Sequence, residues 1–339
     1  MIYSLQILRF LAALFVVLTH SMGELGVSGR IGAFGVDLFF VISGFIIAHV
    51  TEGDQSHFAA KRIIRIVPLY WLFTLFLAAV ALVAPSLLNS AEFDVVHILS
   101  SLLFYPLWTE QTEFKPLLKL GWTLNYEVFF YVLFFVAMKI SHRHREVLAG
   151  LLIAAAVTGV ALVRPEDTNP LTFYGRNIMF EFVFGMALAK LYRSDLSWRI
   201  APLPASALVV LGFVCMVLLT YQNGSFDRVV YYGLPSAAVL YAALCAEPWL
   251  VRLPARFRTV MVRAGDLSYP MYLIHIYVIA VIARLLDMDL SLGVLFAVAL
   301  GGTILASWVV DVFYDGPLRR ALRLWLIDRG VRKVSTVSN

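Results

Sequence analysis

Two ionisable residues, Arg9 and His20, lie in an otherwise apolar run from Leu5 to Met22. In a helix, their spacing brings the two side chains to within about 20° of each other and separates them by about 16 Å along the axis. The run is long enough to cross a bilayer, which needs about 20 mostly apolar residues. Ionisable groups inside such a helix usually face a protein interior or a wet cavity and mark a functional path. The alternative is an Arg that extends toward the headgroups beside a packed His.

The overall composition is that of a membrane protein. Of the 339 residues, 61% are hydrophobic and 14% are charged, and the mean hydropathy of +0.83 is above the range of soluble domains. No internal repeat or shift in composition divides the chain. We therefore predict an all-α, polytopic fold with one transmembrane domain over residues 1–318 and a basic cytoplasmic tail over residues 319–339.

Hydropathy predicts ten transmembrane helices. They are expected over residues 5–23, 32–50, 66–84, 121–139, 146–163, 174–192, 203–221, 228–246, 268–286 and 291–313. A further apolar segment at 95–108 is too short to cross a bilayer, so we predict a re-entrant or interfacial helix there.

The basic residues predict the orientation of these spans. Most of the 27 lysines and arginines fall in loops on one side of the predicted bundle, and few fall in the opposite loops. The positive-inside rule therefore places both the N-terminus and the C-terminus in the cytoplasm. These predicted cytoplasmic lysines and arginines explain the net charge of +5, and they favour contact with anionic lipid headgroups. No motif supports binding to nucleic acid.

With this orientation, the polar residues inside the spans fall into two layers. An inner layer on the cytoplasmic side is expected to hold Arg9, Tyr70 and His275. An outer layer is expected to hold His20, Asp37, Glu127 and Glu181, with Ser43 between the two layers. A polar track of this kind is expected of a protein that moves a group or a proton across the membrane.

Five motifs in order along the chain resemble those of one family. They are RFLAALFVVLTH (Arg9 to His20), GVDLFFVISGF (Gly35 to Phe45), KRIIRIVPLYW (Lys61 to Trp71), WTLNYEVFFY (Trp122 to Tyr131) and SYPMYLIH (Ser268 to His275). Together they resemble the acyltransferase 3 family of membrane O-acyltransferases, in particular bacterial members that acetylate exopolysaccharide.

The resemblance implies a bacterial inner-membrane enzyme and its substrates. The expected donor is cytosolic acyl-CoA, most simply acetyl-CoA, as a co-substrate, with no permanently bound cofactor. The expected acceptor is a polysaccharide or a lipid-linked oligosaccharide. A homodimer is kept as a hypothesis, and the acyl chain and the acceptor sugar are left open.

The phosphates of CoA need cations, and Arg binds them in fork geometry. Arg62 and Arg65 are one helical turn apart on the predicted cytoplasmic side, so we predict that they bind the nucleotide end of CoA. Their alternative role is to stabilise the topology. The residues expected to line the rest of the acyl-CoA path are Arg9, Tyr70, Ser43 and His275. A packed core histidine is an equal alternative for His275.

His20 is the predicted catalytic centre, because removing the proton of a sugar hydroxyl needs a base that titrates near neutrality. A carboxylate would hold its tautomer, and we favour Glu127 over Asp37. The alternatives are a packing ion pair of Glu127 with Arg176, and a helix-dipole role for Asp37. His20 would act either as a general base for direct transfer or as a transient acyl carrier. The sequence does not choose between the two mechanisms.

The acceptor site is predicted around Glu127, because Trp122, Asn125 and Tyr131 give that helix a polar and aromatic lining. Glu181 either lines the same site or serves the structure. No cluster of residues has metal-ligand spacing on one face.

Two other classes of membrane protein share some of these features. A proton-coupled secondary transporter also uses buried Arg, His and acidic residues, but the chain shows no repeat symmetry or paired broken helices. The other large class of membrane O-acyltransferases places its histidine late in the chain.

Overall fold

The computed structural model describes residues 1–24, 31–53, 55–84, 94–194, 199–220, 227–285 and 292–328. Within these ranges every regular element is a helix, and the only β pairing is an isolated bridge between Thr109 and Glu113. The predicted all-α class is therefore confirmed. The end of the predicted basic tail, 329–339, lies outside the described residues, while residues 319–328 continue in helical conformation.

Within the described residues, eight helices are long and apolar enough to cross a membrane. They cover Tyr3–Gly23, Phe58–Val83, Lys119–Ile140, Arg145–Val163, Pro202–Thr220, Val229–Arg252, Ala255–Arg284 and Gly293–Asp328. Each of the ten predicted spans overlaps a helix, but two of these helices are short. α2 (Gly35–Val50) has 16 residues and α8 (Phe180–Arg193) has 14. At 1.5 Å per residue they measure about 24 Å and about 21 Å, less than the ~30 Å hydrocarbon thickness.

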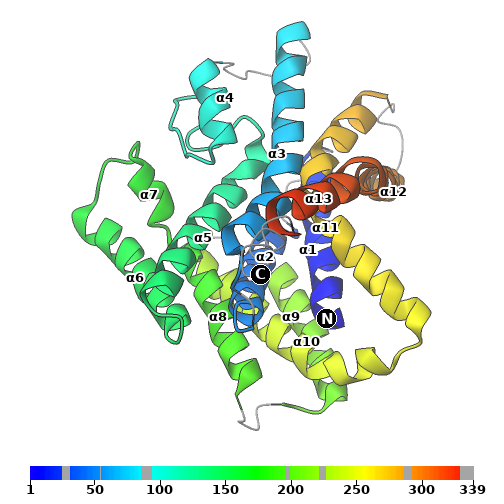
Figure 1. Ribbon diagram of the computed structural model, residues 1–339. Helices are drawn as coiled ribbons and strands as arrows, with labels where there is room; N and C mark the ends of the chain where they lie inside the picture. The colour runs from blue at the N-terminus through cyan, green and yellow to red at the C-terminus, as the bar shows by residue number, and fades with distance from the viewer. Residues whose placement is uncertain are drawn as a thin grey trace, which may run out of the picture. The chain divides into compact units, whose positions relative to one another are not determined.

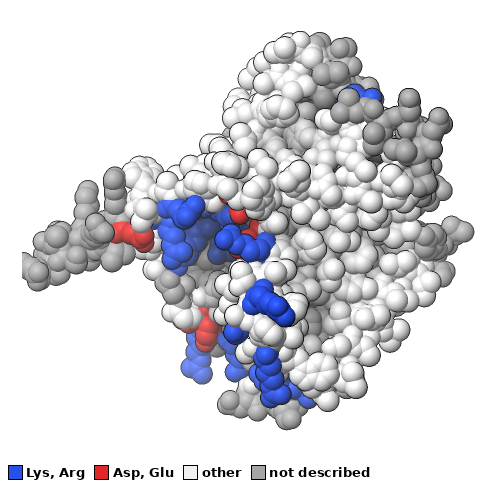
Figure 2. All heavy atoms as spheres, turned by 90° about the vertical axis from the view of Figure 1, so that its right-hand side faces the viewer, with Lys and Arg blue, Asp and Glu red and all other residues white. Residues whose placement is uncertain are grey.

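The chain is thus a multi-pass membrane protein, and large apolar side chains lie on the surface of many helices, as lipid contact requires. Figure 2 shows broad areas without charged side chains, with Lys and Arg gathered over one part of the view. The number of ten spans and the cytoplasmic position of both termini stay predictions.

Two helices begin well before the predicted positions. α3 (Phe58–Val83) starts eight residues earlier than residue 66, and α11 (Ala255–Leu285) starts 13 residues earlier than residue 268. Hydropathy detects only the apolar part of a helix, and both early turns carry several cations. The short segment predicted at 95–108 contains α4 (Val95–Leu102), which at eight residues cannot cross a bilayer.

The described residues form two compact units. Unit 1 combines Met1–Val50 with Phe180–Trp308. Its helices are α1 (Tyr3–Glu24), α2, α8, α9 (Pro202–Thr220), the π-helical turn η4 (Val229–Gly233), α10 (Leu234–Arg252), α11 and most of α12 (Leu292–Val310).

In unit 1, α1 lies along α11, as Figure 1 shows. Ala13 and Val17 of α1 form a buried cluster with Met271 of α11. The two helices run in the same direction, because Gln6 lies against Gly265 near one end and His20 lies against His275 toward the other. This register decides which polar side chains meet between them.

The short helices α2 and α8 pack backbone against backbone. A Cβ atom on Gly44 would lie 2.1 Å from the Phe182 carbonyl oxygen, and one on Gly185 would lie 2.0 Å from that of Val41. Small residues allow this close approach between membrane helices. The contact fixes Asp37 on α2 and Glu181 on α8 in one bundle.

The first turn of α1 is held by Glu247 of α10. The backbone N–H groups of Tyr3 and Ser4 donate to its two carboxylate oxygens at 2.8 and 2.7 Å. A carboxylate at this position accepts hydrogen bonds from two N–H groups that have no partner inside the helix. Its negative charge also interacts favourably with the positive end of the helix dipole. This contact sets the start of the helix that carries Arg9 and His20.

Unit 2 combines the described residues of Thr51–Met179 and Val309–Asn339. Its elements are α3, α4, η2 (Lys119–Gly121), α5 (Trp122–Ile140), α6 (Arg145–Val163), α7 (Pro170–Tyr174), η3 (Asn177–Met179), η5 (Asp311–Asp315), α13 (Gly316–Arg323) and η6 (Leu324–Asp328). α5 packs against α6, and α3 contacts α4, α5 and α13.

Side-chain hydrogen bonds fasten the irregular parts of unit 2 to its helices. Trp71 of α3 donates from its indole nitrogen to the carbonyl of Leu102 at 2.8 Å. The Tyr126 hydroxyl of α5 donates to the carbonyl of Phe173 at 2.6 Å. These bonds anchor α4 beside α3, which carries Arg62 and Arg65, and α7 beside α5, which carries the predicted acceptor-site residues of this unit.

Candidate active site

A pair of histidines lies between α1 and α11 of unit 1. Nε2 of His275 is 3.2 Å from Nδ1 of His20, and the ring centroids are 4.9 Å apart. His275 is completely buried, whereas His20 is partly exposed. The same His20 nitrogen is 3.0 Å from the carbonyl oxygen of Val16, and Nδ1 of His275 is 3.1 Å from that of Met271. The structure therefore links the two motif histidines directly.

This pairing corrects the predicted layers, which separated His275 from His20. The error comes from the start of α11. Because α11 begins at Ala255, His275 lies 20 residues, or about 30 Å, from the start of that helix. The predicted start at residue 268 had placed it only about seven residues from the same end.

Arg9 lies on α1, three turns before His20, and is buried with 6% of its surface exposed. Its guanidinium donates to the side-chain oxygen of Gln6 at 3.0 Å. Ser43 is partly buried on α2 of the same unit. Both residues thus belong to the unit that holds the histidine pair.

A second cluster in unit 1 joins Asp37, Arg228 and Glu181. Nε and a terminal nitrogen of Arg228 each donate to a different oxygen of Asp37 at 2.7 Å, and Arg228 also donates to the Ala33 carbonyl at 3.1 Å. Asp37 and Glu181 are completely buried, and Glu181 interacts electrostatically with both other members. One cation thus faces two carboxylates. The sequence alone did not identify Arg228 as a partner of either carboxylate, because the three residues are far apart along the chain.

In unit 2, Glu127 and Tyr131 form one hydrogen-bonded pair one turn apart on α5, in which the Tyr131 hydroxyl donates to the Glu127 carboxylate. The guanidinium carbon of Arg62 is 6.0 Å from the centre of the Tyr131 ring. Arg65 also interacts electrostatically with Tyr131. The structure therefore brings two predicted CoA-binding arginines together with two predicted acceptor-side residues.

Three further predicted residues lie in unit 2. Asn125 of α5 is completely buried, and its amide oxygen and nitrogen have no hydrogen-bond partner among the described residues. Tyr70 is also completely buried and packs against Gly121 and the ring of Phe104. Trp122 is partly exposed, with its ring 5.9 Å from that of Tyr126. A buried amide without hydrogen bonds lowers the stability of the fold, so the side chain of Asn125 is suited to bind a polar ligand.

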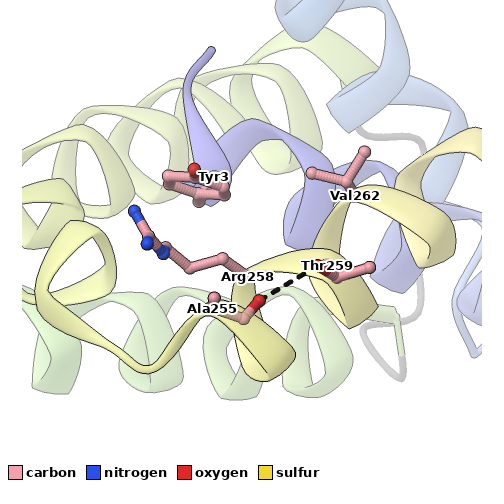
Figure 3. Close-up of a pocket in the computed structure, with 5 residues that line it drawn as sticks. All are labelled: Tyr3, Ala255, Arg258, Thr259 and Val262. Carbon is pink, nitrogen blue, oxygen red and sulfur yellow. Dashed lines mark hydrogen bonds between the residues drawn. The ribbon is translucent and has the colours of Figure 1, made fainter.

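A hollow of about 280 Å³ lies beside the first turns of α1 and α11 in unit 1. It is lined by Tyr3, Ala255, Arg258, Thr259 and Val262, and Figure 3 shows their side chains around it. Its lining holds one cation and no carboxylate, so it suits an anionic group. Tyr3 precedes Arg9 by six residues, or about 9 Å of helix.

Among the described residues, no group of three or more His, Cys, Asp or Glu side chains is arranged to hold a metal ion. The groups that can do chemistry are therefore the histidine pair, the two carboxylate clusters and the arginines. On membrane-type helices, a partly exposed imidazole held by a second histidine is a candidate base for a membrane-embedded group transfer.

Comparison with known proteins gives the family. The sequence pattern of the acyltransferase 3 family, described as an acyltransferase domain, matches residues 2–312. The chain belongs to this family, its long apolar helices suit a membrane protein, and its relatives include an O-acetyltransferase.

Relatives were found in several bacteria. The exopolysaccharide production protein ExoZ of Rhizobium meliloti is 34% identical over 93% of this chain and 98% of its own length. Acyltransferase MdmB of Streptomyces mycarofaciens is 26% identical over 86% of this chain and 82% of its own. O-acetyltransferase OatA of Staphylococcus aureus is 25% identical over 79% of this chain and 49% of its own. No solved structure matches.

Proposed function

We propose that this protein transfers an acyl group, most simply acetyl, from cytosolic acyl-CoA to hydroxyls of a bacterial exopolysaccharide or a related surface glycan. The most similar relative described above is an exopolysaccharide production protein, and another is an O-acetyltransferase. The observation that supports the proposal most is the partly exposed imidazole of His20, held against His275 on a membrane-type helix. The proposed location is the bacterial inner membrane.

The proposed donor site begins at Arg62 and Arg65. Both lie on the early, charged turns of α3, where arginines can bind the phosphates of CoA by charge-assisted hydrogen bonds. Arg62 has a buried Nε without a hydrogen-bond partner among the described residues, so it has a donor left for a ligand. Along the acyl-CoA path, the proposed lining residues are Arg9, Tyr70 and Ser43.

The proposed chemistry is centred on His20. As a general base it would take the proton of the acceptor hydroxyl, and as a nucleophile it would carry the acyl group as an acyl-imidazole. Glu127 is the proposed catalytic carboxylate, and the proposed acceptor site lies around it. Asp37 is the weaker candidate, because both of its carboxylate oxygens already accept hydrogen bonds from Arg228.

The proposed acceptor site uses Trp122, Asn125 and Tyr131 of α5, with Glu181 as a further lining residue. Asn125 supports this role best, since its buried amide would gain hydrogen bonds from sugar hydroxyls. Tyr131 and Trp122 add aromatic surface for a sugar ring. A homodimer stays a hypothesis.

The experiment that tests the proposal measures, in one assay, the loss of the acetyl-CoA thioester and the formation of the ester on the polymer. The purified protein in liposomes receives labelled acetyl-CoA inside and an unacetylated exopolysaccharide outside. We expect one CoA thiol released for each ester formed on the polymer. Movement of a substrate across the bilayer without loss of thioester would contradict the proposal and would favour a transporter.

A further inference from the structure

We infer that His275 is a positioning residue for His20, holding its ring in the tautomer that leaves Nε2 unprotonated. The inference rests on the proposed function, because it gives His20 its chemical task. It departs from the sequence prediction, which placed His275 along the acyl-CoA path. Three nitrogen contacts carry it: His275 Nδ1 to the Met271 carbonyl, His275 Nε2 to His20 Nδ1, and His20 Nδ1 to the Val16 carbonyl.

The proton positions follow from what each nitrogen faces. A carbonyl oxygen only accepts hydrogen bonds, so Nδ1 of His275, 3.1 Å from the Met271 oxygen, must carry a proton. In a neutral imidazole the other nitrogen is then a bare acceptor. Nε2 of His275 therefore accepts a hydrogen bond from whatever it faces.

Nε2 of His275 faces Nδ1 of His20 at 3.2 Å. Nδ1 of His20 is also 3.0 Å from the carbonyl oxygen of Val16, another pure acceptor. Both neighbours therefore require the proton of His20 to lie on Nδ1. The neutral ring of His20 then has its lone pair on Nε2, and no hydrogen bond to that nitrogen occurs within the described residues.

This tautomer is the one that proton transfer from the acceptor requires. In direct transfer, the acceptor hydroxyl oxygen bonds to the thioester carbonyl carbon while its proton passes to Nε2 of His20. The carbon–sulfur bond then breaks, and the same proton passes to the CoA sulfur, so the products are the ester and the free thiol. While His20 is protonated, its Nδ1–H bond to His275 becomes charge-assisted and therefore stronger.

A neutral imidazole thus fills the place that a carboxylate takes in other base–orienter pairs. The carboxylates of unit 1 described above lie elsewhere: Asp37 is bound by Arg228, Glu181 interacts electrostatically with that pair, and Glu247 is bound to the start of α1. A second neutral ring also avoids placing another full charge in the buried space between α1 and α11.

Two substitutions of similar size and polarity separate positioning from packing. The amide of Gln reaches the place of Nε2 in a histidine, whereas the amide of Asn reaches only the place of Nδ1. His275→Gln therefore keeps an acceptor for Nδ1–H of His20, and His275→Asn removes it while keeping a polar group near Met271.

We expect His275→Gln to retain kcat for acetyl transfer within about tenfold, and His275→Asn to lose about 100-fold or more, as wrong-tautomer variants do. The KM for acetyl-CoA should change little in both variants. A ¹⁵N spectrum of histidine-labelled protein should show His20 protonated on Nδ1 in the wild type and in His275→Gln, and a mixture of tautomers in His275→Asn.

Equal kcat values and equal His20 tautomers in the two variants would overturn the inference. A rise in the KM for acetyl-CoA with unchanged kcat would also overturn it, because that result would assign His275 to the acyl-CoA path. If either variant fails to fold, the wild-type ¹⁵N spectrum decides, because a proton on Nε2 of His20 contradicts the inference. His20→Ala tells the two proposals apart. Full activity in that variant rejects the His20 mechanism, whereas lost activity with equal His275 variants rejects only the positioning role.

Discussion

Replacing Arg228 should destabilise unit 1 by leaving a charge buried. Asp37 is completely buried and takes two hydrogen bonds from the guanidinium, each 2.7 Å long. Removing one partner of a buried ion pair costs about 3–5 kcal/mol. The Arg228 side chain is 31% exposed, so the lower end applies. We therefore expect Arg228→Leu to cost about 3 kcal/mol, roughly a 150-fold change in the unfolding equilibrium constant.

The assay is reversible unfolding in mixed detergent micelles, followed by tryptophan fluorescence. The double variant Asp37→Leu with Arg228→Leu should be more stable than Arg228→Leu alone, because it also removes the Asp37 carboxylate that Arg228→Leu leaves buried without its partner. Arg256→Leu, an exposed cation of the same unit, is the control and should change stability by less than about 0.5 kcal/mol. A wild-type-like Arg228→Leu, or a double variant as unstable as the sum of both single ones, would refute the reasoning.

The remaining predictions concern the donor site and two packing contacts. The double variant Arg62→Ala with Arg65→Ala should raise the KM for acetyl-CoA about tenfold or more, because charge-assisted bonds to phosphate are lost. The control Arg256→Ala should leave that KM unchanged. An unchanged KM in the double variant would mean that the two arginines only stabilise the membrane topology. Glu247→Ala should lower stability by about 1–2 kcal/mol in the same unfolding assay, as lost helix caps do, and a neutral result would mean that water replaces the carboxylate. Gly185→Val should abolish the monodisperse peak in size-exclusion chromatography, because its Cβ would lie 2.0 Å from a backbone oxygen of α2, and a folded variant would show that the two helices can separate.

The sequence predicted the helical class and the approximate place of every long helix, because long apolar runs carry that information directly. It also predicted that Arg62 and Arg65 lie one turn apart on a helix, which α3 confirms. The boundaries were less accurate where charged turns continue a helix beyond its apolar part. The early starts of α3 and α11 have this cause.

The contacts within the candidate site were harder to predict. Hydropathy assigns a depth to each residue separately, and an error of 13 residues in the start of α11, about three and a half turns, was enough to separate His275 from His20. Arg228 and Asp37 are 191 residues apart, and no local pattern shows that they meet. Glu127 and Tyr131 could be paired from the sequence, because residues four apart share a helix face. Long-range polar pairs depend on helix register, which one sequence does not give.

The most direct test of the account is the rate of acetyl transfer in His20→Ala. Labelled acetyl-CoA and the acceptor polymer are supplied to liposomes that contain equal amounts of folded wild-type or variant protein. The account predicts that the variant forms no ester above the rate of protein-free liposomes while it still binds acetyl-CoA. Ester formation at the wild-type rate would contradict the central role given to His20.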